Sequence, residues 1–485
     1  GDQVAPVLAR PAQMAVTVVV WESRTGDEID IYAQMIDNNS GVPLWQPWDG
    51  VPVCTVNGVQ RNPVAAYDSM GGVIIAWEDF RLNAGQIPDS TTVCEIYAHR
   101  LLLSTGACDP VWNAAPVGVP VCAGLSSIAR DVSIAGSTDG AFIAWTDFRN
   151  ASPYPAYNNR DVYIQYLLSA TASWPSGNWV SNGIPAHRYT GDNQQRPALQ
   201  TDYAYRGNPA RYGVFVAFED DRLGWWQIYA LNLPSTGVPT WRDDVRVAPT
   251  AEDELRPCIA SSGSPSLQPF YGAVVAWEDW RNYGASGVDV YSQRIDEAGT
   301  RYWPVGLPTK VGLALCTHAG DQGGLALSAR GYRAFVAWAD PIYQGAGGGN
   351  GIDIYGNAID FPTNSAVWSA ASAEAICSLA EDQLTPAVDV GADMTYICWR
   401  DCRVGSSASD IYVQGYSTSN PAAGTRWLDG GHPVTQAVSA QILPDILGEV
   451  IVWQDGRRNP ITADGRNDEN IYAELLGDEC DAPTD

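Results

Sequence analysis

Residues 274–299 read VVAWEDWRNYGASGVDVYSQRIDEAG, and this stretch decides the fold because versions of it recur along the whole chain. An apolar run leads to Trp, an acid and Arg, and a variable stretch then leads to a branched aliphatic residue followed by Tyr. Self-similarity at a nearly fixed period is the signature of a repeat architecture. The eight anchor aromatics, spaced 54 to 73 residues apart, are Trp21, Trp77, Trp145, Phe218, Trp277, Trp338, Trp399 and Trp453.

Each repeat contains four short runs rich in Val, Ile, Tyr and Trp, separated by Gly, Pro, Asp and Asn. Such runs, bounded by turn residues, are typical of β-strands. No segment shows the 3.6-residue apolar period of a helix. Four strands in a unit of about 60 residues match a propeller blade. We therefore predict an all-β fold, an eight-bladed β-propeller with four-stranded blades.

The repeats fill the chain, so we predict a single domain of residues 1–485. The last repeat stops after its third run, NIYAELL (470–476), whereas QVAPV (3–7) resembles the GVPV of other fourth strands. We expect the N-terminal strand to complete the last blade and close the ring, which would leave no open sheet edge. The expected blades are 9–58, 59–125, 126–190, 191–250, 251–317, 318–379, 380–436, and 437–478 together with 1–8.

The net charge of the chain limits the classes of partner that we expect it to bind. It carries 28 Lys and Arg against 55 Asp and Glu, a formal net charge of −27. Such a chain has no basic surface to release counterions from a phosphate backbone, so no nucleic-acid partner is expected. No apolar run approaches the roughly 18 residues of a membrane span, so membrane insertion is not expected. The N-terminal GDQVAPV has neither a basic region nor an apolar stretch. We expect a secreted or surface protein whose signal peptide has been removed.

The repeated polar residues have two interpretations. Trp277, Asp279 and Arg281 lie two residues apart, which places them on one face of an extended strand. Eight catalytic or metal-binding carboxylates around a ring have no evident chemical use, whereas an Arg–carboxylate pair can satisfy the strand ends. We therefore interpret the pattern as a structural latch between blades. The latch residues are Trp77, Asp79, Arg81, Trp145, Asp147, Arg149, Trp277, Asp279, Arg281, Trp399, Asp401 and Arg403, with Tyr32 and Tyr291 from the second half of the repeat.

Departures from the pattern favour the same interpretation. Gln227 and Asn470 replace the acid before the aliphatic–Tyr pair in two repeats. The constant feature there is an oxygen acceptor and not a charge. Ser23 stands where the first repeat should have Asp, and Ile342 stands where the sixth should have Arg. In these two repeats either residues of a functional site have replaced the latch, or the residues have changed without a functional reason.

The connection between the second and third strands varies most in length. Variable loops on a constant scaffold are where binding sites usually lie. Aromatic residues in these loops can stack on sugar rings or simply cover the rim. The candidates for a ligand-binding face are Tyr154, Tyr157, Trp225, Trp226, Tyr283 and Tyr343.

Metal sites and disulfides have weaker signals. The four histidines show no HxH, HExxH or Cys–His spacing that we take as a zinc signature, so zinc is not expected. An acidic loop makes calcium the one cofactor that the sequence suggests, through Asp464, Asp468 and Glu469, with a solvated acidic loop as the alternative. Ten cysteines are compatible with a few disulfides in an exported protein. Cys94 and Cys108, which flank an expected hairpin, form the preferred pair.

The string AWEDxR…DIYAQRID…G…W…GVPVC resembles the repeats of large secreted or surface-exposed bacterial β-propeller proteins. This resemblance extends over essentially the whole chain and implies the propeller fold and an extracellular location. It implies little about activity, because propellers host many functions. The sequence lacks the SxDxGxTW box of sialidases and the tryptophan-docking motif of quinone-dependent dehydrogenases, which disfavours both enzyme classes.

Three functions remain open on the sequence alone. The leading hypothesis is a non-enzymatic extracellular binding or scaffolding propeller whose variable loops bind a glycan, a surface protein or copies of itself. The second is a carbohydrate-active hydrolase or lyase acting at the central channel, suggested by the aromatic loops and the many carboxylates. The third is a subunit of a filament or surface assembly, since flat propeller discs stack readily. We assign no enzymatic activity at this stage.

Overall fold

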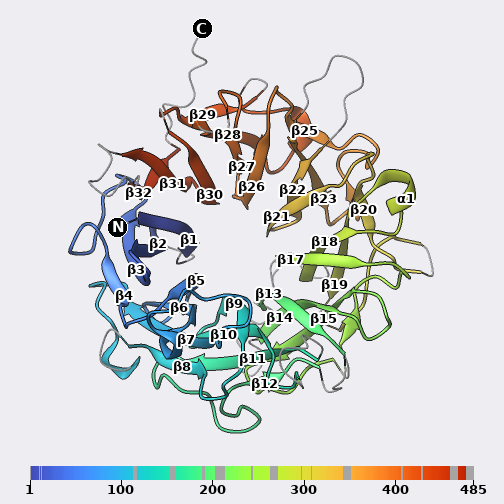
Figure 1. Ribbon diagram of the computed structural model, residues 1–485. Coiled ribbons are helices and arrows are strands. Elements are labelled where there is room, and N and C mark those ends of the chain that lie inside the picture. The colour runs from blue at the N-terminus through green and yellow to red at the C-terminus, as the bar shows by residue number, and fades with distance from the viewer. Residues whose placement is uncertain are drawn as a thin grey trace. The chain divides into compact units, whose positions relative to one another are not determined.

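The computed structural model confirms an all-β chain with the fold class of an eight-bladed β-propeller (Figure 1). The chain divides into two compact units, Gly1–Val245 and Arg246–Asp485, and each contributes four antiparallel sheets. The structure describes residues 2–9, 11, 14–112, 117–151, 159–187, 192–202, 213–241, 244–262, 271–296, 298–306, 309–341, 351–405, 408–427, 430–437, 439–458 and 468–476.

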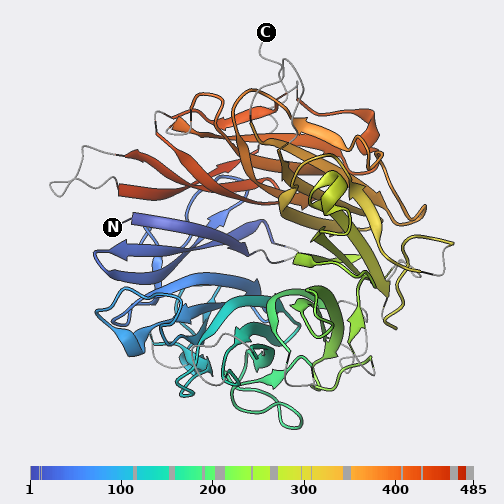
Figure 2. The ribbon, with the colours of Figure 1, turned by 45° about the vertical axis from the view of Figure 1, so that its right-hand side comes forward.

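In the first unit each sheet has four strands, and strands that follow one another in the chain are neighbours in the sheet. Figure 2 shows the first two sheets, in dark and lighter blue, layered on one another. The strands are β1 (Asp2–Ala9), β2 (Val16–Thr25), β3 (Glu28–Asp37), β4 (Val51–Cys54), β5 (Gln60–Tyr67), β6 (Gly72–Asp79), β7 (Glu95–Leu102), β8 (Val119–Cys122), β9 (Ala129–Gly136), β10 (Gly140–Asp147), β11 (Asp161–Leu168), β12 (Ile184–Pro185), β13 (Gln194–Asp202), β14 (Gly213–Asp220), β15 (Gln227–Pro234) and, at the boundary, β16 (Val245–Arg246).

The second unit repeats this order with two variations. Its second sheet has five strands because both β24 and β25 pair with β23, and its last sheet has three strands in the described part of the chain. The strands are β17 (Glu254–Ser262), β18 (Gly272–Asp279), β19 (Asp289–Asp296), β20 (Leu313–Cys316), β21 (Gly323–Arg330), β22 (Arg333–Asp340), β23 (Asp353–Asp360), β24 (Ser365–Ala366), β25 (Glu374–Cys377), β26 (Gln383–Val390), β27 (Met394–Asp401), β28 (Asp410–Ser417), β29 (His432–Thr435), β30 (Gln441–Leu447), β31 (Val450–Arg458) and β32 (Asp468–Leu475).

The N-terminal strand does not complete the last blade, contrary to the prediction. β1 pairs with β2 and is the first strand of the first blade. Its sequence explains this, because Gln3-Val4-Ala5-Pro6 matches the Gln-x-x-Pro that opens other first strands, such as those at 60–63 and 383–386. The likeness of QVAPV to the GVPV of fourth strands is therefore misleading.

A β-bulge interrupts the first strand of every blade, and in five of the eight it lies at this motif. One residue at each bulge has a φ between +50° and +66°, a region that non-glycine residues seldom adopt. The bulge leaves a backbone N–H unpaired within its sheet. The residues with this positive φ are Ala5, Asn62, Asp131, Arg196, Arg256, Gly324, Thr385 and Leu443.

At the second and third blades, a buried acid of the preceding blade binds the backbone amide of the bulge residue. The backbone N–H of Asn62 donates to Oε1 of Glu22 over 2.9 Å, and that of Asp131 donates to Oε1 of Glu78 over 2.9 Å. Both glutamates are at most 3% exposed. The Glu of the WE pair therefore joins adjacent blades, because one of its oxygens accepts from the neighbouring sheet. The other oxygen binds within its own blade, as Oε2 of Glu22 does with Arg24 over 2.9 Å.

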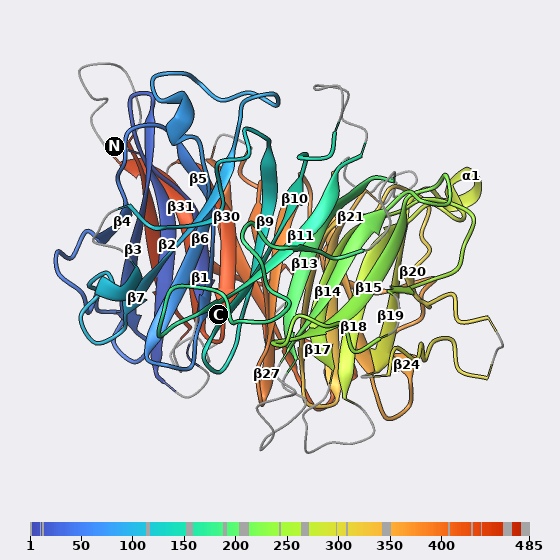
Figure 3. The same ribbon diagram turned by 90° about the horizontal axis from the view of Figure 1, so that it is seen from below.

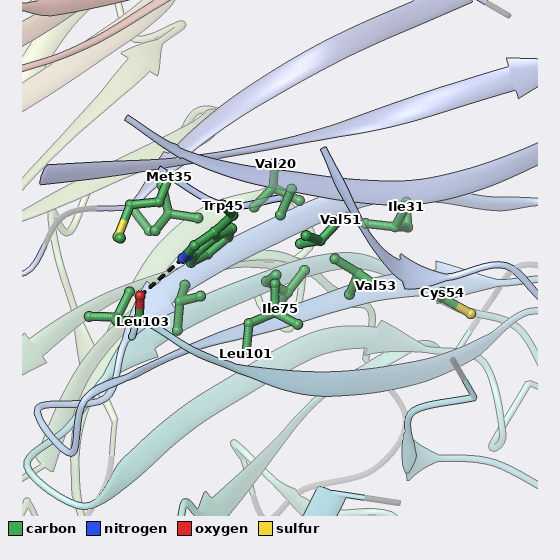
Figure 4. Close-up of a cluster of buried hydrophobic side chains, with 14 of the residues drawn as sticks. Val20, Ile31, Met35, Trp45, Val51, Val53, Cys54, Ile75, Leu101 and Leu103 are labelled. Atoms are coloured by element: carbon green, nitrogen blue, oxygen red, sulfur yellow. Dashed lines mark hydrogen bonds between the residues drawn. The ribbon is translucent and has the colours of Figure 1, made fainter. Parts of the chain in front are cut away.

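A second junction lies at the opposite end of the sheets, in the connection between the third and fourth strands. Nε1 of Trp45 donates to the carbonyl of Leu103 in the next blade over 3.0 Å, and Nε1 of Trp112 donates likewise to Ser169 over 2.9 Å. Figure 4 shows Trp45 among buried apolar side chains from two adjacent sheets, including Val20 of β2. The core of the fold therefore lies between the blades.

The helices in the described residues are single turns. α1 (Tyr283–Ser286) and η1 (Arg81–Asn83) lie in connections between second and third strands, while η2 (Pro110–Trp112) and η5 (Pro421–Ala423) lie between third and fourth strands. Figure 3 shows α1 at one end of β18 and β19. Among the described helices, none has the length and apolar character needed to cross a membrane.

Candidate functional site

The repeated polar residues gather where the second strand of a blade ends and the third begins, which we call the Asp end. Asp279 is the last residue of β18 and is fully buried. Its Oδ2 accepts hydrogen bonds from Nε1 of Trp277 (2.7 Å) and Nη2 of Arg281 (2.6 Å). Its Oδ1 accepts from Nε (2.7 Å) and the backbone N–H (2.9 Å) of Arg281. Four donors, two of them on the guanidinium of Arg281, thus satisfy the carboxylate.

An aromatic ring from the third strand completes this arrangement. The guanidinium of Arg281 lies 3.7 Å from the ring centre of Tyr291, and that ring stacks on Trp277 with the centroids 6.4 Å apart. Tyr32 stacks on Trp21 in the same way, also at 6.4 Å. The structure therefore brings these residues together, but their hydrogen bonds lie within one blade and not between blades as the latch interpretation expected. The same Trp–Asp–Arg bonds link Trp77, Asp79 and Arg81, Trp145, Asp147 and Arg149, and Trp399, Asp401 and Arg403.

The cysteine that ends a fourth strand reaches the latch of the next blade. Sγ of Cys122 lies 3.4 Å from Oδ2 of Asp147 and 3.3 Å from Nη2 of Arg149. Cys377 occupies the same position beside Asp401 and Arg403, at 3.8 and 3.7 Å. Burial raises the pKa of the Cys377 thiol to about 12. These thiols therefore pack as neutral groups against a carboxylate–guanidinium pair.

A second carboxyl group lies opposite the latch carboxylate, because the first residue of the third strand pairs with the last residue of the second. Asp410 pairs with Asp401 in this way. Burial, followed by the charge of Asp401, raises the pKa of Asp410 to about 6. Burial likewise raises the pKa of Asp30 and of Asp353 to about 6. These positions accordingly disfavour a charge, which fits the Gln227 and Asn470 found there in other blades.

The first and fourth blades depart from the pattern. Ser23 replaces the latch Asp of the first blade, and Nε1 of Trp21 is buried there without an acceptor in the described residues. In the fourth blade Nη2 of Arg222 bridges Oδ2 of Asp220 (2.5 Å) and Oδ2 of Asp244 (2.6 Å). The second acid is therefore an addition specific to this blade.

His187 joins this fourth-blade network from the preceding blade. Its Nδ1 lies 3.1 Å from Oδ2 of Asp244. Burial alone would raise the pKa of Asp244, but hydrogen bonds from His187 and Arg222 lower it overall. Asp244 is thus held as a charged carboxylate between two donors.

The sixth blade departs most from the Trp–Asp–Arg pattern of the other blades. Asp340 ends β22, is fully buried and accepts a hydrogen bond from Nε1 of Trp338 over 3.1 Å. Nδ1 of His318 lies 3.4 Å from its Oδ2, and Sγ of Cys316 lies 3.7 Å from the same oxygen. The hydrogen bond with Asp340 raises the pKa of His318. Among the described residues, these three form a cluster whose ligand atoms all lie within 4.8 Å of one another.

The loop aromatics divide into three groups. Trp225 and Tyr283 are 47% and 55% exposed at the Asp ends of their blades. Trp226 is partly buried, and the guanidinium of Arg160 lies 5.2 Å from its ring centre. Tyr154, Tyr157 and Tyr343 lie outside the described residues.

The calcium prediction finds no support in what is described. Asp464 lies outside the described residues, and for Asp468 only the backbone is described. Oε2 of Glu469 accepts a hydrogen bond from Nε2 of Gln454 over 2.5 Å. The one described carboxylate of the three is thus bound within its own sheet.

The predicted disulfide between Cys94 and Cys108 is wrong, since both are free thiols. Cys94 immediately precedes β7, while Cys108 bridges with Leu101 near the far end of that strand. Seven residues of strand span about 23 Å at about 3.3 Å per residue. A disulfide requires Cα atoms within about 7 Å. The hairpin turn lies between the end of β7 and Cys108. It therefore brings Cys108 next to the end of β7, whereas Cys94 lies at the start of that strand.

No family model and no curated protein sequence matches the chain. Among solved structures, an acylaminoacyl peptidase from Pyrococcus horikoshii is similar over 93% of this chain at 7% identity and a TM-score of 0.42, and the chain spans 57% of that protein. A leech intramolecular trans-sialidase is similar over 87% of this chain and 69% of its own, at 10% identity and a TM-score of 0.39. An α-L-arabinofuranosidase from Lactobacillus brevis is similar over 65% of this chain and 94% of its own, at 14% identity and a TM-score of 0.27. At these values the likenesses carry no inference about activity.

Proposed function

We propose that the chain is a non-enzymatic extracellular binding or scaffolding propeller that presents variable loops at the Asp ends of its blades. The observation that carries this proposal is the internal use of the repeated acids. Asp79, Asp147, Asp279 and Asp401 are at most 1% exposed, and each binds the Trp and Arg of its own blade. A carboxylate enclosed in this way cannot reach a substrate, so its repetition serves the scaffold.

A glycan is the ligand class that the exposed loop residues support. Trp225 and Tyr283 are exposed aromatic side chains in the loops that vary in length between blades. Aromatic side chains with a few polar groups line most small-ligand sites. The resemblance of the repeats to secreted and surface-exposed bacterial propellers supports an extracellular location. The net charge of −27 favours solubility in that setting.

A glycan array probed with the purified chain tests this proposal. We expect binding to at least one glycan class, with a loss of about 10-fold or more in Trp225→Ala or Tyr283→Ala. Trp48→Ala is the matched control, because Trp48 is 69% exposed but lies between a third and a fourth strand, at the other end of its sheet. Silence across the array, or equal loss in the control, contradicts the proposal.

A carbohydrate-active enzyme is the alternative, and the raised pKa of Asp30 and of Asp410 favours it, since carboxyl groups with a pKa of about 6 suit general acid catalysis. Release of reducing ends from a polysaccharide panel, lost in Asp30→Asn or Asp410→Asn, would establish it. No release from any polysaccharide would leave the binding function in place.

A role in a filament or surface assembly is tested by the state of the free protein. Sedimentation at increasing protein concentration, with and without calcium, separates the two cases. Reversible growth beyond the monomer supports self-association, whereas a constant monomer contradicts it.

A further inference from the structure

The sixth blade keeps the acid of the latch but not its cation. Asp340 is 0% exposed. Six other repeats carry Arg four residues after the anchor aromatic, whereas the sixth repeat has Ile342 at that position. A buried carboxylate is costly unless a positive group compensates it. In this blade the groups within 4 Å of Oδ2 of Asp340 include His318 and Cys316, both contributed by the end of the preceding blade.

The corresponding junctions between other blades show which group normally lies beside the buried acid. We call these the sibling junctions. Beside Cys377 and Asp401, Nη2 of Arg403 lies 3.7 Å from the sulfur and 2.6 Å from the carboxylate oxygen. A cation thus sits between a thiol and an acid at the ordinary junction. His318 takes the cation position at the sixth blade, and imidazole differs from guanidinium in being a metal ligand.

We propose that Cys316, His318 and Asp340 form a three-ligand site for a borderline divalent cation such as Zn²⁺. Around a tetrahedral zinc ion with bonds of about 2.0–2.3 Å, the ligand atoms are about 3.3–3.5 Å apart. The separations of 3.4 Å (His318 Nδ1 to Asp340 Oδ2) and 3.7 Å (Cys316 Sγ to Asp340 Oδ2) lie close to these edges. One sulfur, one nitrogen and one oxygen donor select zinc-like ions over calcium or magnesium.

The surroundings of His318 fix its ring as those of metal-bound imidazoles do. Nδ1 of His318 faces the carboxylate of Asp340 over 3.4 Å, and Tyr355 lies edge-on to the imidazole with the ring centroids 5.4 Å apart. Such outer contacts set the orientation of a ligating histidine. Cys316 ends β20 of the fifth blade, whereas Asp340 ends β22 of the sixth, so the ion would join two blades as the guanidinium does elsewhere. Three protein ligands leave a fourth position for water or an external ligand.

The test uses untagged full-length protein stripped with a chelator and titrated with Co²⁺, whose charge-transfer absorption reports a cobalt–thiolate bond, and with Zn²⁺ by calorimetry. We expect one equivalent of tightly bound metal and a higher thermal midpoint on zinc addition. Cys316→Ser should abolish the absorption and weaken zinc binding by at least about 100-fold. Cys377→Ser, at the sibling junction with Arg403, should leave both unchanged.

His318→Gln keeps the test decisive if Cys316→Ser does not fold, because the His318 side chain is 13% exposed whereas Cys316 is fully buried. A cooperative melt and near-ultraviolet circular dichroism establish folding for each variant. Loss of the cobalt signal in folded His318→Gln supports the site. Absence of the signal in the unmodified chain, or its survival in Cys316→Ser or His318→Gln, overturns the proposal.

Discussion

The indole N–H of Trp277 donates to Oδ2 of Asp279 over 2.7 Å, two residues further along the same strand. The same bond recurs with lengths of 2.8 to 3.1 Å in five other blades. A strand places residues i and i+2 on one face. The bond therefore follows from the local sequence, and the burial of both groups makes it costly to lose.

Asp279→Ala should lower the free energy of unfolding by about 3–5 kcal/mol, because it leaves a buried indole N–H and the guanidinium of Arg281 without their acceptor. Urea unfolding followed by tryptophan fluorescence measures the change. Asp393→Ala is the control, since Asp393 is exposed, and should change stability by no more than about 0.5 kcal/mol. Equal effects of the two substitutions would show that the latch contributes nothing.

Ser23→Asn should stabilise the first blade by about 1 kcal/mol, because an amide oxygen can accept from the orphaned Nε1 of Trp21. Ser23→Asp should be less favourable, since the new charge would face Asp30 without a guanidinium. Adding Thr25→Arg to Ser23→Asp rebuilds the full latch and should recover the stability. If the double variant melts no higher than Ser23→Asp, the proposed pairing is wrong.

Asp410→Asn should raise stability at neutral pH. The folded pKa of about 6 exceeds the ordinary value of 3.8, so between roughly pH 4 and 6 the folded state binds more protons than the unfolded state, and stability falls as the pH rises. Removing the carboxyl should add about 1 kcal/mol at pH 7.5 and nothing below about pH 4. Thermal melts at the two pH values measure the difference, and a pH-independent gain would contradict the assigned cause.

Gly312→Ala should destabilise the fifth blade by about 2 kcal/mol or more. Gly312 has a φ of +94°, and a Cβ there would lie 2.8 Å from the ring of Trp277 and 3.0 Å from the carbonyl of Ser292. Gly306→Ala is the matched control, because Gly306 also has a positive φ, +81°, but nothing lies within 4 Å of its Cβ position. It should cost only about 1 kcal/mol of backbone strain. Similar losses in the two variants would exclude the steric contact.

Cys54 and Cys377 should resist alkylation by iodoacetamide at pH 8 in the native chain. Burial raises the pKa of both thiols to about 12, and the thiolate is the reactive form. Cys108, which is partly exposed, should react sooner, and all three should react in urea. Mass spectrometry of the digested protein measures the labelling, and recovery of a Cys94–Cys108 crosslinked peptide would restore the disulfide rejected above.

Some contacts of the site could be predicted from the sequence. Trp, Asp and Arg at alternate positions share a strand face, so the Trp277–Asp279–Arg281 contacts need only local geometry. The role of Glu22 and Glu78 was missed because their partners are bulge amides of another blade. The bulge itself has a visible signal, the Gln-x-x-Pro motif, which would also have placed the N-terminal strand correctly.

The sequence by itself determined the number of repeats, their all-β character and the shared strand face of Trp, Asp and Arg, because these depend on the period of the chain and on neighbours two residues apart. Only the tertiary structure decided which groups meet between blades. Cys316 and Asp340 are 24 residues apart, yet their side chains approach to 3.7 Å. Such pairs arise because the end of one sheet packs against the second strand of the next, and no local periodicity records that packing.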